Sequence, residues 1–146
     1  MSKGIALIIE DTDANRDFFE RLITQAGYEI RSAKTGKEAL EAADAVDSLA
    51  LAIIDMQMPD TNGIDLTFHL VKKFPNACLI IASMHDDRAL MQKAFDTGCN
   101  VYMVKPHGLI ELFQTLNSIG HEGLRSMGKT VIDQYGMRPY KTISFV

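Results

Sequence analysis

Five polar residues follow directly after short apolar runs of the sequence: Glu10, Asp11, Asp55, Ser83 and Lys105. Three of them are carboxylates, and carboxylates that lie close together repel one another and raise each other's pKa. A hard divalent cation or a fixed ammonium group would relieve that repulsion. A set of oxygen ligands suits Mg²⁺, which keeps several waters and commonly binds a substrate phosphate as well.

Such a set of side chains could carry out phosphoryl transfer. A carboxylate beside Mg²⁺ can attack phosphorus and form an acyl phosphate. The metal and Lys105 would neutralise charge on the transferring group, and Ser83 would donate a hydrogen bond to it. Taken singly, each residue also has an ordinary interpretation as a helix cap or a turn residue. The chemistry therefore depends on whether the fold brings the five together.

Short apolar runs alternate with segments of helical periodicity through the first 120 residues. The runs lack polar–apolar alternation and are typical of strands buried on both faces; they cover residues 5–9, 28–33, 49–54, 78–82 and 101–104. The helical segments are 15–26, 36–46, 63–74, 86–97 and the stretch after Pro106. In the first of these, the apolar face is expected to hold Phe18, Leu22, Ile23 and Ala26.

This alternation predicts an α/β fold: a doubly wound, five-stranded parallel sheet with right-handed crossovers and helices on both faces. In such folds the carboxyl ends of the strands meet at one edge of the sheet, and ligands bind there. All five polar residues follow a strand end. We therefore expect them to share one cleft.

The order of these residues resembles the receiver domains of two-component response regulators. The motifs that carry the resemblance are Glu10-Asp11, Asp55 with Met58-Pro59 and Gly63, Ser83, and Lys105-Pro106. Four motifs in this order are specific, and the resemblance covers roughly residues 3–119. It implies a flavodoxin-like fold with strand order 2-1-3-4-5.

The resemblance also implies a role for each site residue. Asp55 would be the phosphoacceptor. Ser83 would be the switch hydroxyl, and Tyr102 would be an aromatic side chain that moves between exposed and buried positions. Lys105 would point its ammonium at the phosphoryl group, and its bond to Pro106 would be cis. The implied Mg²⁺ ligands are Glu10, Asp11, Asp55 and the backbone carbonyl of Gln57.

The implied function is a phosphorylation-dependent signalling switch rather than an enzyme with an external substrate. A sensor histidine kinase or a phosphotransfer protein would supply the phosphoryl group, and the domain would catalyse only its own phosphorylation and dephosphorylation. The output would lie in a downstream effector protein or in an output domain of a longer regulator. The alternative is a degenerate receiver that acts as a phosphorylation-independent binding module, although such domains usually lack the acceptor, the acidic pair or the lysine.

Three positions beside the site bear on the lifetime of an acyl phosphate. The residue after the switch hydroxyl is usually small in this family, and here it is Met84, which could shield Asp55 from water and small phosphodonors. Gln57 and His85 occupy the positions that tune the rate of acyl phosphate hydrolysis in the family. The sequence alone does not tell whether they raise or lower this rate.

Two other classes of α/β protein fit less well. A flavin-binding flavodoxin needs a loop rich in Ser, Thr or Gly after the first strand to bind phosphate, whereas residues 10–15 read EDTDAN. A haloacid-dehalogenase-type phosphatase places a second Asp two residues after its nucleophile, where this chain has Gln57. That class also needs a cap domain or a longer chain.

Composition and charge argue against further classes. The 146 residues are 47% apolar and 23% charged, which is ordinary for a globular domain. A net charge of −4 gives no electrostatic reason to expect direct nucleic-acid binding. No apolar run approaches the roughly 18 residues that span a bilayer, and no signal peptide is evident, so a cytoplasmic location without membrane contact is expected. Cys78 and Cys99 form neither a disulfide framework nor a metal-binding cluster.

Residues 1–120 are thus expected to form the receiver domain, and residues 121–146 a C-terminal tail or linker. Leu124, Met127, Val131 and Tyr135 recur at helical spacing, which predicts a short helix up to Gly136. Residues 141–146 alternate polar and apolar side chains, which predicts an edge strand or extended arm. The tail holds four Lys or Arg against two Asp or Glu, and the rest holds eleven against seventeen. We expect the tail to dock on its own domain or on a second subunit of a homodimer.

Overall fold

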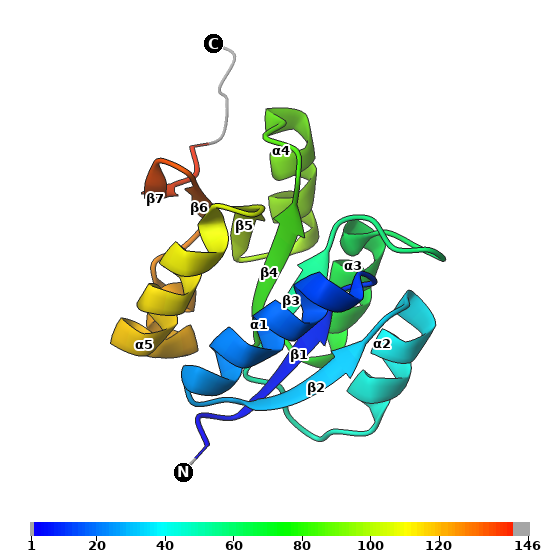
Figure 1. Ribbon diagram of the computed structural model, residues 1–146. Coiled ribbons are helices and arrows are strands. Elements are labelled where there is room, and N and C mark those ends of the chain that lie inside the picture. Colours follow the sequence, from blue (N-terminus) through cyan, green and yellow to red (C-terminus); the bar gives the residue numbers. More distant parts are fainter. Residues whose placement is uncertain (1, 142–146) are drawn as a thin grey trace.

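The computed structural model describes residues 2–141, which form one seven-stranded sheet covered by helices on both faces (Figure 1). The strands are β1 (Ile5–Ile9), β2 (Glu29–Ala33), β3 (Leu51–Asp55), β4 (Cys78–Ser83), β5 (Val101–Val104), β6 (Thr130–Asp133) and β7 (Gly136–Pro139). The helices are α1 (Asp13–Gln25), α2 (Gly36–Asp44), α3 (Gly63–Lys73), α4 (Arg88–Thr97) and α5 (Gly108–Ser126).

The strand order is β2-β1-β3-β4-β5-β6-β7. The first six strands in this order run parallel, and β7 pairs antiparallel with β6. The predicted flavodoxin-like order 2-1-3-4-5 is therefore confirmed. Two further strands, which the sequence analysis did not predict, extend the sheet beyond β5.

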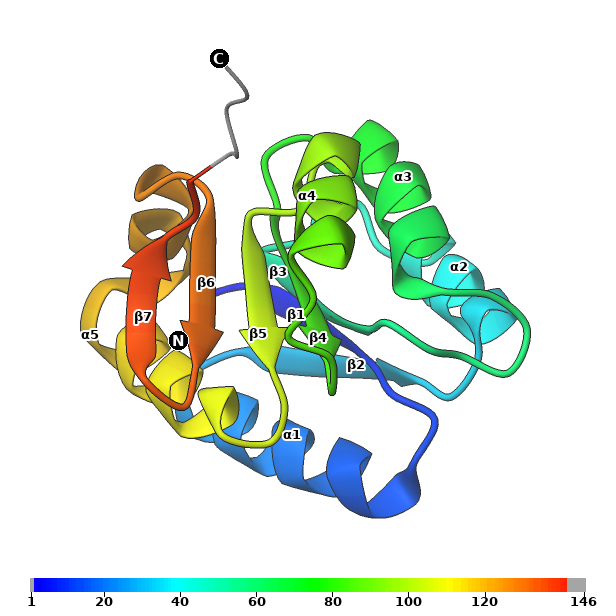
Figure 2. The same ribbon diagram turned by 90° about the horizontal axis from the view of Figure 1, so that it is seen from above.

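Two layers of helices enclose the sheet. Helices α1 and α5 lie on one face, and α2, α3 and α4 lie on the other (Figure 2). Under α1 and α5 the core includes Ile23, Leu112 and Leu116, and under α2 and α3 it includes Ala39 and Leu66. Because both faces of the central strands are covered, β3 and β4 are buried along their whole length, as the continuous apolar runs predicted.

Two details of the first layer differ from the prediction. Helix α1 turns Phe19 towards the sheet, with 4% of its surface exposed, and leaves Phe18 49% exposed. Ile23 and Ala26 are buried as predicted. Phe19 lies one turn before Ile23 and completes this face, whereas Phe18 points about 100° away from Phe19. Strand β2 is not buried on both faces: only Ala33 is buried there, since β2 is the edge of the sheet and has a neighbour on one side only.

The C-terminal segment forms strands where the sequence analysis predicted a helix up to Gly136. Helix α5 runs on to Ser126 with a break at Gly120 (φ 71°, ψ 179°), and β6 then pairs with β5. The helical prediction fails beyond this point because Thr130, Val131 and Ile132 are β-branched and favour a strand. From residue 142 on, the predicted extended arm lies outside the described residues.

Glycine at the start of α5 lets the helix approach the added strand closely. A Cβ atom on Gly108 would lie 2.9 Å from the carbonyl oxygen of Ile132 in β6. The hairpin of β6 and β7 is thus built against both β5 and α5. Both cysteines, Cys78 and Cys99, are buried thiols outside any disulfide. Among residues 2–141, no helix has the length and apolar character that a membrane span requires.

Candidate functional site

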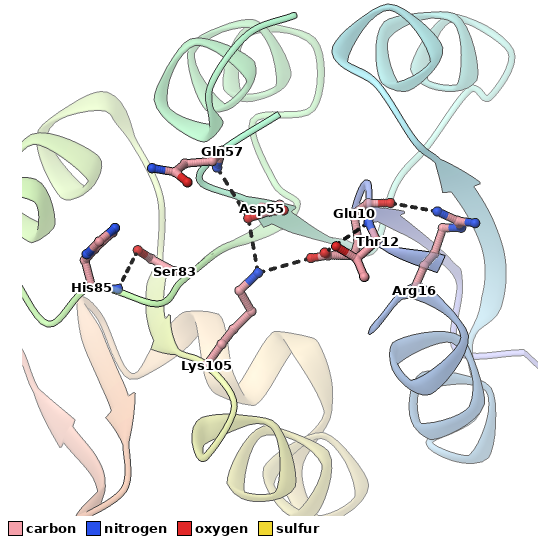
Figure 3. Close-up of polar contacts among 8 residues, drawn as sticks. All are labelled: Glu10, Thr12, Arg16, Asp55, Gln57, Ser83, His85 and Lys105. Carbon is pink, nitrogen blue, oxygen red and sulfur yellow. Dashed lines mark hydrogen bonds and ion pairs between the residues drawn. The ribbon is translucent and has the colours of Figure 1, made fainter. Parts of the chain in front are cut away.

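The carboxyl ends of four parallel strands enclose a cleft of about 310 Å³. As predicted from the strand ends, all five polar residues line this cleft. Figure 3 shows Glu10, Asp55, Ser83 and Lys105 converging from separate strands; Asp11 is not drawn. The complete lining is Glu10, Asp11, Thr12, Asn15, Asp55, Met56, Gln57, Ser83, Met84, His85 and Lys105.

One ammonium group bridges two buried carboxylates at the centre of the cleft. The Nζ atom of Lys105 lies 3.2 Å from Oδ1 of Asp55 and 3.2 Å from Oε2 of Glu10. Asp55 is 6% exposed and Glu10 is 1% exposed, so solvent screens these pairs weakly. The backbone N–H of Gln57 also donates to Oδ1 of Asp55, at 3.3 Å.

The carboxyl group of Asp55 has an unusual affinity for protons. Its pKa is raised from an ordinary 3.8 to about 6, mainly by burial and also by the nearby carboxylate of Glu10. The ammonium of Lys105 and the N–H of Gln57 act in the opposite direction. The environment therefore disfavours the charge on Asp55 unless more positive charge enters the cleft.

The same cleft can hold a cation. Glu10, Asp11 and Asp55 each offer a carboxylate oxygen, and these oxygens lie within 4.8 Å of one another. Two of the three carboxylates are buried and share a single lysine. An all-oxygen donor set of this kind, with negative charge in excess, suits a hard divalent cation.

An arginine that the sequence analysis missed holds the acidic end of β1. The Nη1 atom of Arg16 donates to the backbone carbonyl of Glu10 at 3.0 Å, and its Nη2 atom pairs with Asp13. The N–H of Thr12 approaches Oε1 of Glu10 at 3.4 Å. The signal available in the sequence was the i, i+3 pair of Asp13 and Arg16, which lies on the first turn of α1.

The loop after Asp55 is fixed by close packing and by a helix cap. A Cβ atom on Gly63 would lie 2.8 Å from the carbonyl oxygen of Asp55, so only glycine lets α3 begin this near the strand end. Asn62 caps α3 by accepting a hydrogen bond from the N–H of Asp65. Asp60 lies outside the cleft, where it accepts hydrogen bonds from the N–H groups of Gly36 and Lys37 at the start of α2.

A chain of hydrogen bonds leads from the cleft to Tyr102 on β5. The N–H of His85 donates to Oγ of Ser83 at 3.0 Å, and the hydroxyl of Tyr102 donates to the carbonyl of His85 at 2.9 Å. The Tyr102 ring is fully buried, and burial raises the pKa of its hydroxyl, which therefore stays protonated. Val131 of β6 is its neighbour in the parallel ladder.

Met84 and His85 form the outer wall of the cleft. Met84 lines the cleft with 66% of its surface exposed, so whether it shields Asp55 stays a prediction. The peptide bond between Lys105 and Pro106 is cis, as the resemblance implied.

Comparison with known proteins agrees with this geometry. Residues 6–117 match the response regulator receiver domain, which is most of the chain. The chain belongs to the response regulator receiver family. Beyond the matched residues of this receiver lie the end of α5 and both strands of the C-terminal hairpin, β6 and β7.

Curated relatives of this receiver include both short and long proteins. A chemotaxis protein CheY of Thermotoga maritima is 32% identical over 114 residues, which cover 77% of this chain and 94% of the relative. The uncharacterized transcriptional regulatory protein YrkP of Bacillus subtilis is 34% identical over 106 residues, which cover 73% of this chain but only 45% of that protein. The receiver thus spans less than half of some of its relatives.

Solved structures of similar receivers show the same fold. A CheY-like receiver domain protein from Methanospirillum hungatei has a TM-score of 0.75 at 23% identity and covers 88% of this chain and 100% of that chain. A CheX–CheY complex with BeF3 and Mg²⁺ from Borrelia burgdorferi has a TM-score of 0.71 at 22% identity, over 81% of this chain and 90% of that chain.

Proposed function

We propose that this receiver is a phosphorylation-dependent switch in which Asp55 accepts a phosphoryl group from a phosphohistidine. The observation that carries the proposal is the pairing of the buried Asp55 carboxylate with Lys105 in a cleft that two further carboxylates share. In the transfer, a carboxylate oxygen of Asp55 bonds to phosphorus as the N–P bond of the donor breaks. The leaving imidazole takes up a proton from solvent.

The residues around Asp55 have distinct parts in this step. Lys105 loses its ion pair with the carboxylate and neutralises charge on the incoming phosphoryl oxygens. Ser83 accepts a hydrogen bond from His85, so its own hydroxyl proton is free to donate to a phosphoryl oxygen. Met84 limits the approach of water to the acyl phosphate, which lengthens its life.

We propose Mg²⁺ as the cation of the site, held by Glu10, Asp11, Asp55 and the backbone carbonyl of Gln57. Bound there, Mg²⁺ would balance the charge that the phosphoryl group adds. Asp11 is exposed and Glu10 is buried, so the ligand set has an open side towards solvent. A receiver of this kind catalyses only its own phosphorylation and dephosphorylation.

The partners follow from this chemistry. The donor would be a sensor histidine kinase or a phosphotransfer protein. The recipient of the signal would be a downstream effector protein or an output domain in a longer regulator. We further propose that residues 1–120 are the receiver domain proper and that residues 121–146 are a C-terminal tail, whose described part adds the end of α5 and the β6–β7 hairpin to the domain. The family match over residues 6–117 supports this division.

The alternative, a degenerate receiver that never carries a phosphoryl group, is less well supported. Its usual mark is the loss of the acceptor, the acidic pair or the lysine. Here Asp55, Glu10, Asp11 and Lys105 are all present and line one cleft.

Intact-mass measurement tests the proposal. The full chain, incubated with a phosphorylated histidine-containing phosphotransfer protein and Mg²⁺, should gain the mass of one phosphoryl group. Asp55→Asn should abolish the gain while the fold is kept, since the two side chains are nearly isosteric. Asp47→Asn, which changes an exposed aspartate outside the cleft, is the matched control. Uptake by Asp55→Asn at the control level would refute the assignment.

A further inference from the structure

A second and larger cleft lies between α4 and the C-terminal hairpin of β6 and β7. Its volume is about 660 Å³. Its lining residues are Asp86, Arg88, Met91, Val131, Arg138, Pro139, Tyr140 and Lys141. Five of these eight residues come from the C-terminal segment, beyond the family match at residues 6–117. The cleft is therefore a feature that this chain's own C-terminal strands create.

The rim of this cleft is positively charged, although the chain as a whole carries a net charge of −4. Arg88, Arg138 and Lys141 are exposed at the rim, and Asp86 is the one acidic lining residue. Arg138 also pairs with Asp133, at 2.6 Å. The excess of positive charge favours a ligand with carboxylate groups.

Apolar side chains that are already fixed form the floor of the cleft. Met91, Val131 and Tyr140 are all buried. The hydroxyl of Tyr140 donates to Oε1 of Gln92 at 2.8 Å, and its ring centroid lies 4.6 Å from that of Phe95. A rigid apolar floor under a basic rim fits a peptide with both apolar and acidic side chains. Because the floor residues are already ordered, binding such a peptide would cost them little conformational entropy.

The wall of the cleft is connected to the phosphorylation site. Residues 84–87 link β4 to α4, and this second cleft is lined by Asp86 of the link and by Arg88, the first residue of α4. In the same region His85 is bonded through its N–H to Ser83 and through its carbonyl to Tyr102. A shift of Ser83 towards a phosphoryl group on Asp55 would therefore move the wall that carries Asp86 and Arg88.

We propose that the cleft between α4 and the β6–β7 hairpin is the docking site for an acidic, partly apolar peptide segment of the downstream partner. The inference rests on the proposed function, since it makes this cleft the surface that reads the state of Asp55. An extended peptide fits the size of the cleft better than a single small anion does. Asp86 and Asp133 beside the basic groups disfavour the closely spaced phosphates of a nucleic acid.

A peptide selection tests the inference on the full chain. A phage-displayed library of random peptides is panned on the protein with Mg²⁺ and beryllofluoride, and the selected peptides are titrated by calorimetry. We expect enrichment of Asp and Glu next to apolar residues. Arg88→Gln combined with Lys141→Gln should weaken binding at least about tenfold. Lys141→Glu alone, which keeps Arg88 and the backbone carbonyl of residue 141 to which Arg88 donates at 2.7 Å, should also weaken binding.

Lys93→Gln is the matched control, because it removes an exposed positive charge from the same helix outside the cleft. The inference is overturned if the selected peptides lack acidic residues or if the double variant binds them like the control. It is also overturned if a single-stranded DNA oligonucleotide binds the cleft more tightly than the peptides do. Equal affinity with and without beryllofluoride would overturn the link to Asp55. Phosphoryl uptake, measured by intact mass on the same samples, reports on the proposed function separately.

Discussion

The Nζ atom of Lys105 lies 3.2 Å from Oδ1 of Asp55. The same ammonium also pairs with Glu10, whose Oε2 atom lies at the same distance of 3.2 Å. One positive charge therefore serves two buried carboxylates, and the exposed Asp11 adds a third negative charge at the same place. This excess of negative charge would favour the binding of a divalent cation. Two predictions, on stability and on chemistry, follow from it.

Asp55→Asn should stabilise the fold at pH 7 in the absence of Mg²⁺, by up to about 3 kcal/mol in the free energy of unfolding. The pKa of Asp55 is raised from 3.8 to about 6 in the folded state, mainly by burial. Its contribution to stability is fully present below about pH 4 and is lost as the pH rises through about 6. The advantage of Asn should therefore be absent near pH 4, grow as the pH rises from about 4 to 6, and be nearly complete above pH 6. Urea unfolding with a chelator from pH 4 to 8 measures it, and a pH-independent difference would contradict the prediction.

Lys105→Met should separate metal binding from phosphoryl transfer. Without the ammonium, the developing charge on the phosphoryl group has lost one of its neutralising groups, so the transfer rate should fall by about 10² to 10³. Mg²⁺ should bind more tightly, because Lys105 no longer competes for Glu10 and Asp55. Calorimetry gives the affinity and intact mass gives the rate, with Lys93→Met as the control. A normal transfer rate, or a loss of Mg²⁺ binding, would contradict these roles of Lys105.

The fold could be predicted up to β5 because the strands there, except the edge strand β2, are compact apolar runs with a polar residue at or just after their ends. The same strand ends led directly to Asp55, Ser83 and Lys105, since parallel strands end at one edge of the sheet. Arg16 was missed because its contact with Glu10 is to a backbone carbonyl, which the sequence does not reveal, and its i, i+3 spacing from Asp13 indicates only a pair on the helix. Phe18 was preferred to Phe19 because the phase of a helix is uncertain when two aromatic residues are adjacent.

The C-terminal strands could not be predicted by the same reasoning. Val131 and Tyr135 fit a helical spacing with Leu124 and Met127, and this pattern competed with the β-branched run at Thr130. The outcome depends on tertiary structure. Without β6, the outer edge of β5 would have unpaired backbone groups, and a short strand placed there can form hydrogen bonds with them. A single sequence does not show which edges of a sheet are free.

Ile132→Ala should lower the free energy of unfolding by about 2 to 5 kcal/mol. Ile132 is fully buried in the core that α5 covers, so its truncation leaves a cavity. Tyr135→Ala is the matched control in the same hairpin, because Tyr135 is 83% exposed and its loss should change stability by less than about 0.5 kcal/mol. Chemical denaturation of both variants measures the difference. Equal effects would mean that the hairpin does not belong to the cooperative core.

Beryllofluoride with Mg²⁺ should change amide hydrogen exchange from β4 across to β6. A phosphoryl group adds a charge of about −1.5 to −2 at Asp55, and a mimic of it should draw Ser83 inward. Ser83 is bonded to His85, and His85 to Tyr102, which neighbours Val131 in the sheet. We therefore expect altered exchange in residues 83–88, 101–104 and 130–133.

Tyr102→Phe tests the last contact in this series of hydrogen bonds, the one between Tyr102 and His85. The variant removes the hydroxyl that donates to the carbonyl of His85 and keeps the buried ring. Exchange in residues 83–88 should still respond to beryllofluoride, because the contact between Ser83 and His85 is intact. The response in residues 130–133 should shrink, because that region is reached through Tyr102. Full responses in both regions of the variant would mean that the signal reaches β6 by another route, through α4 or α5.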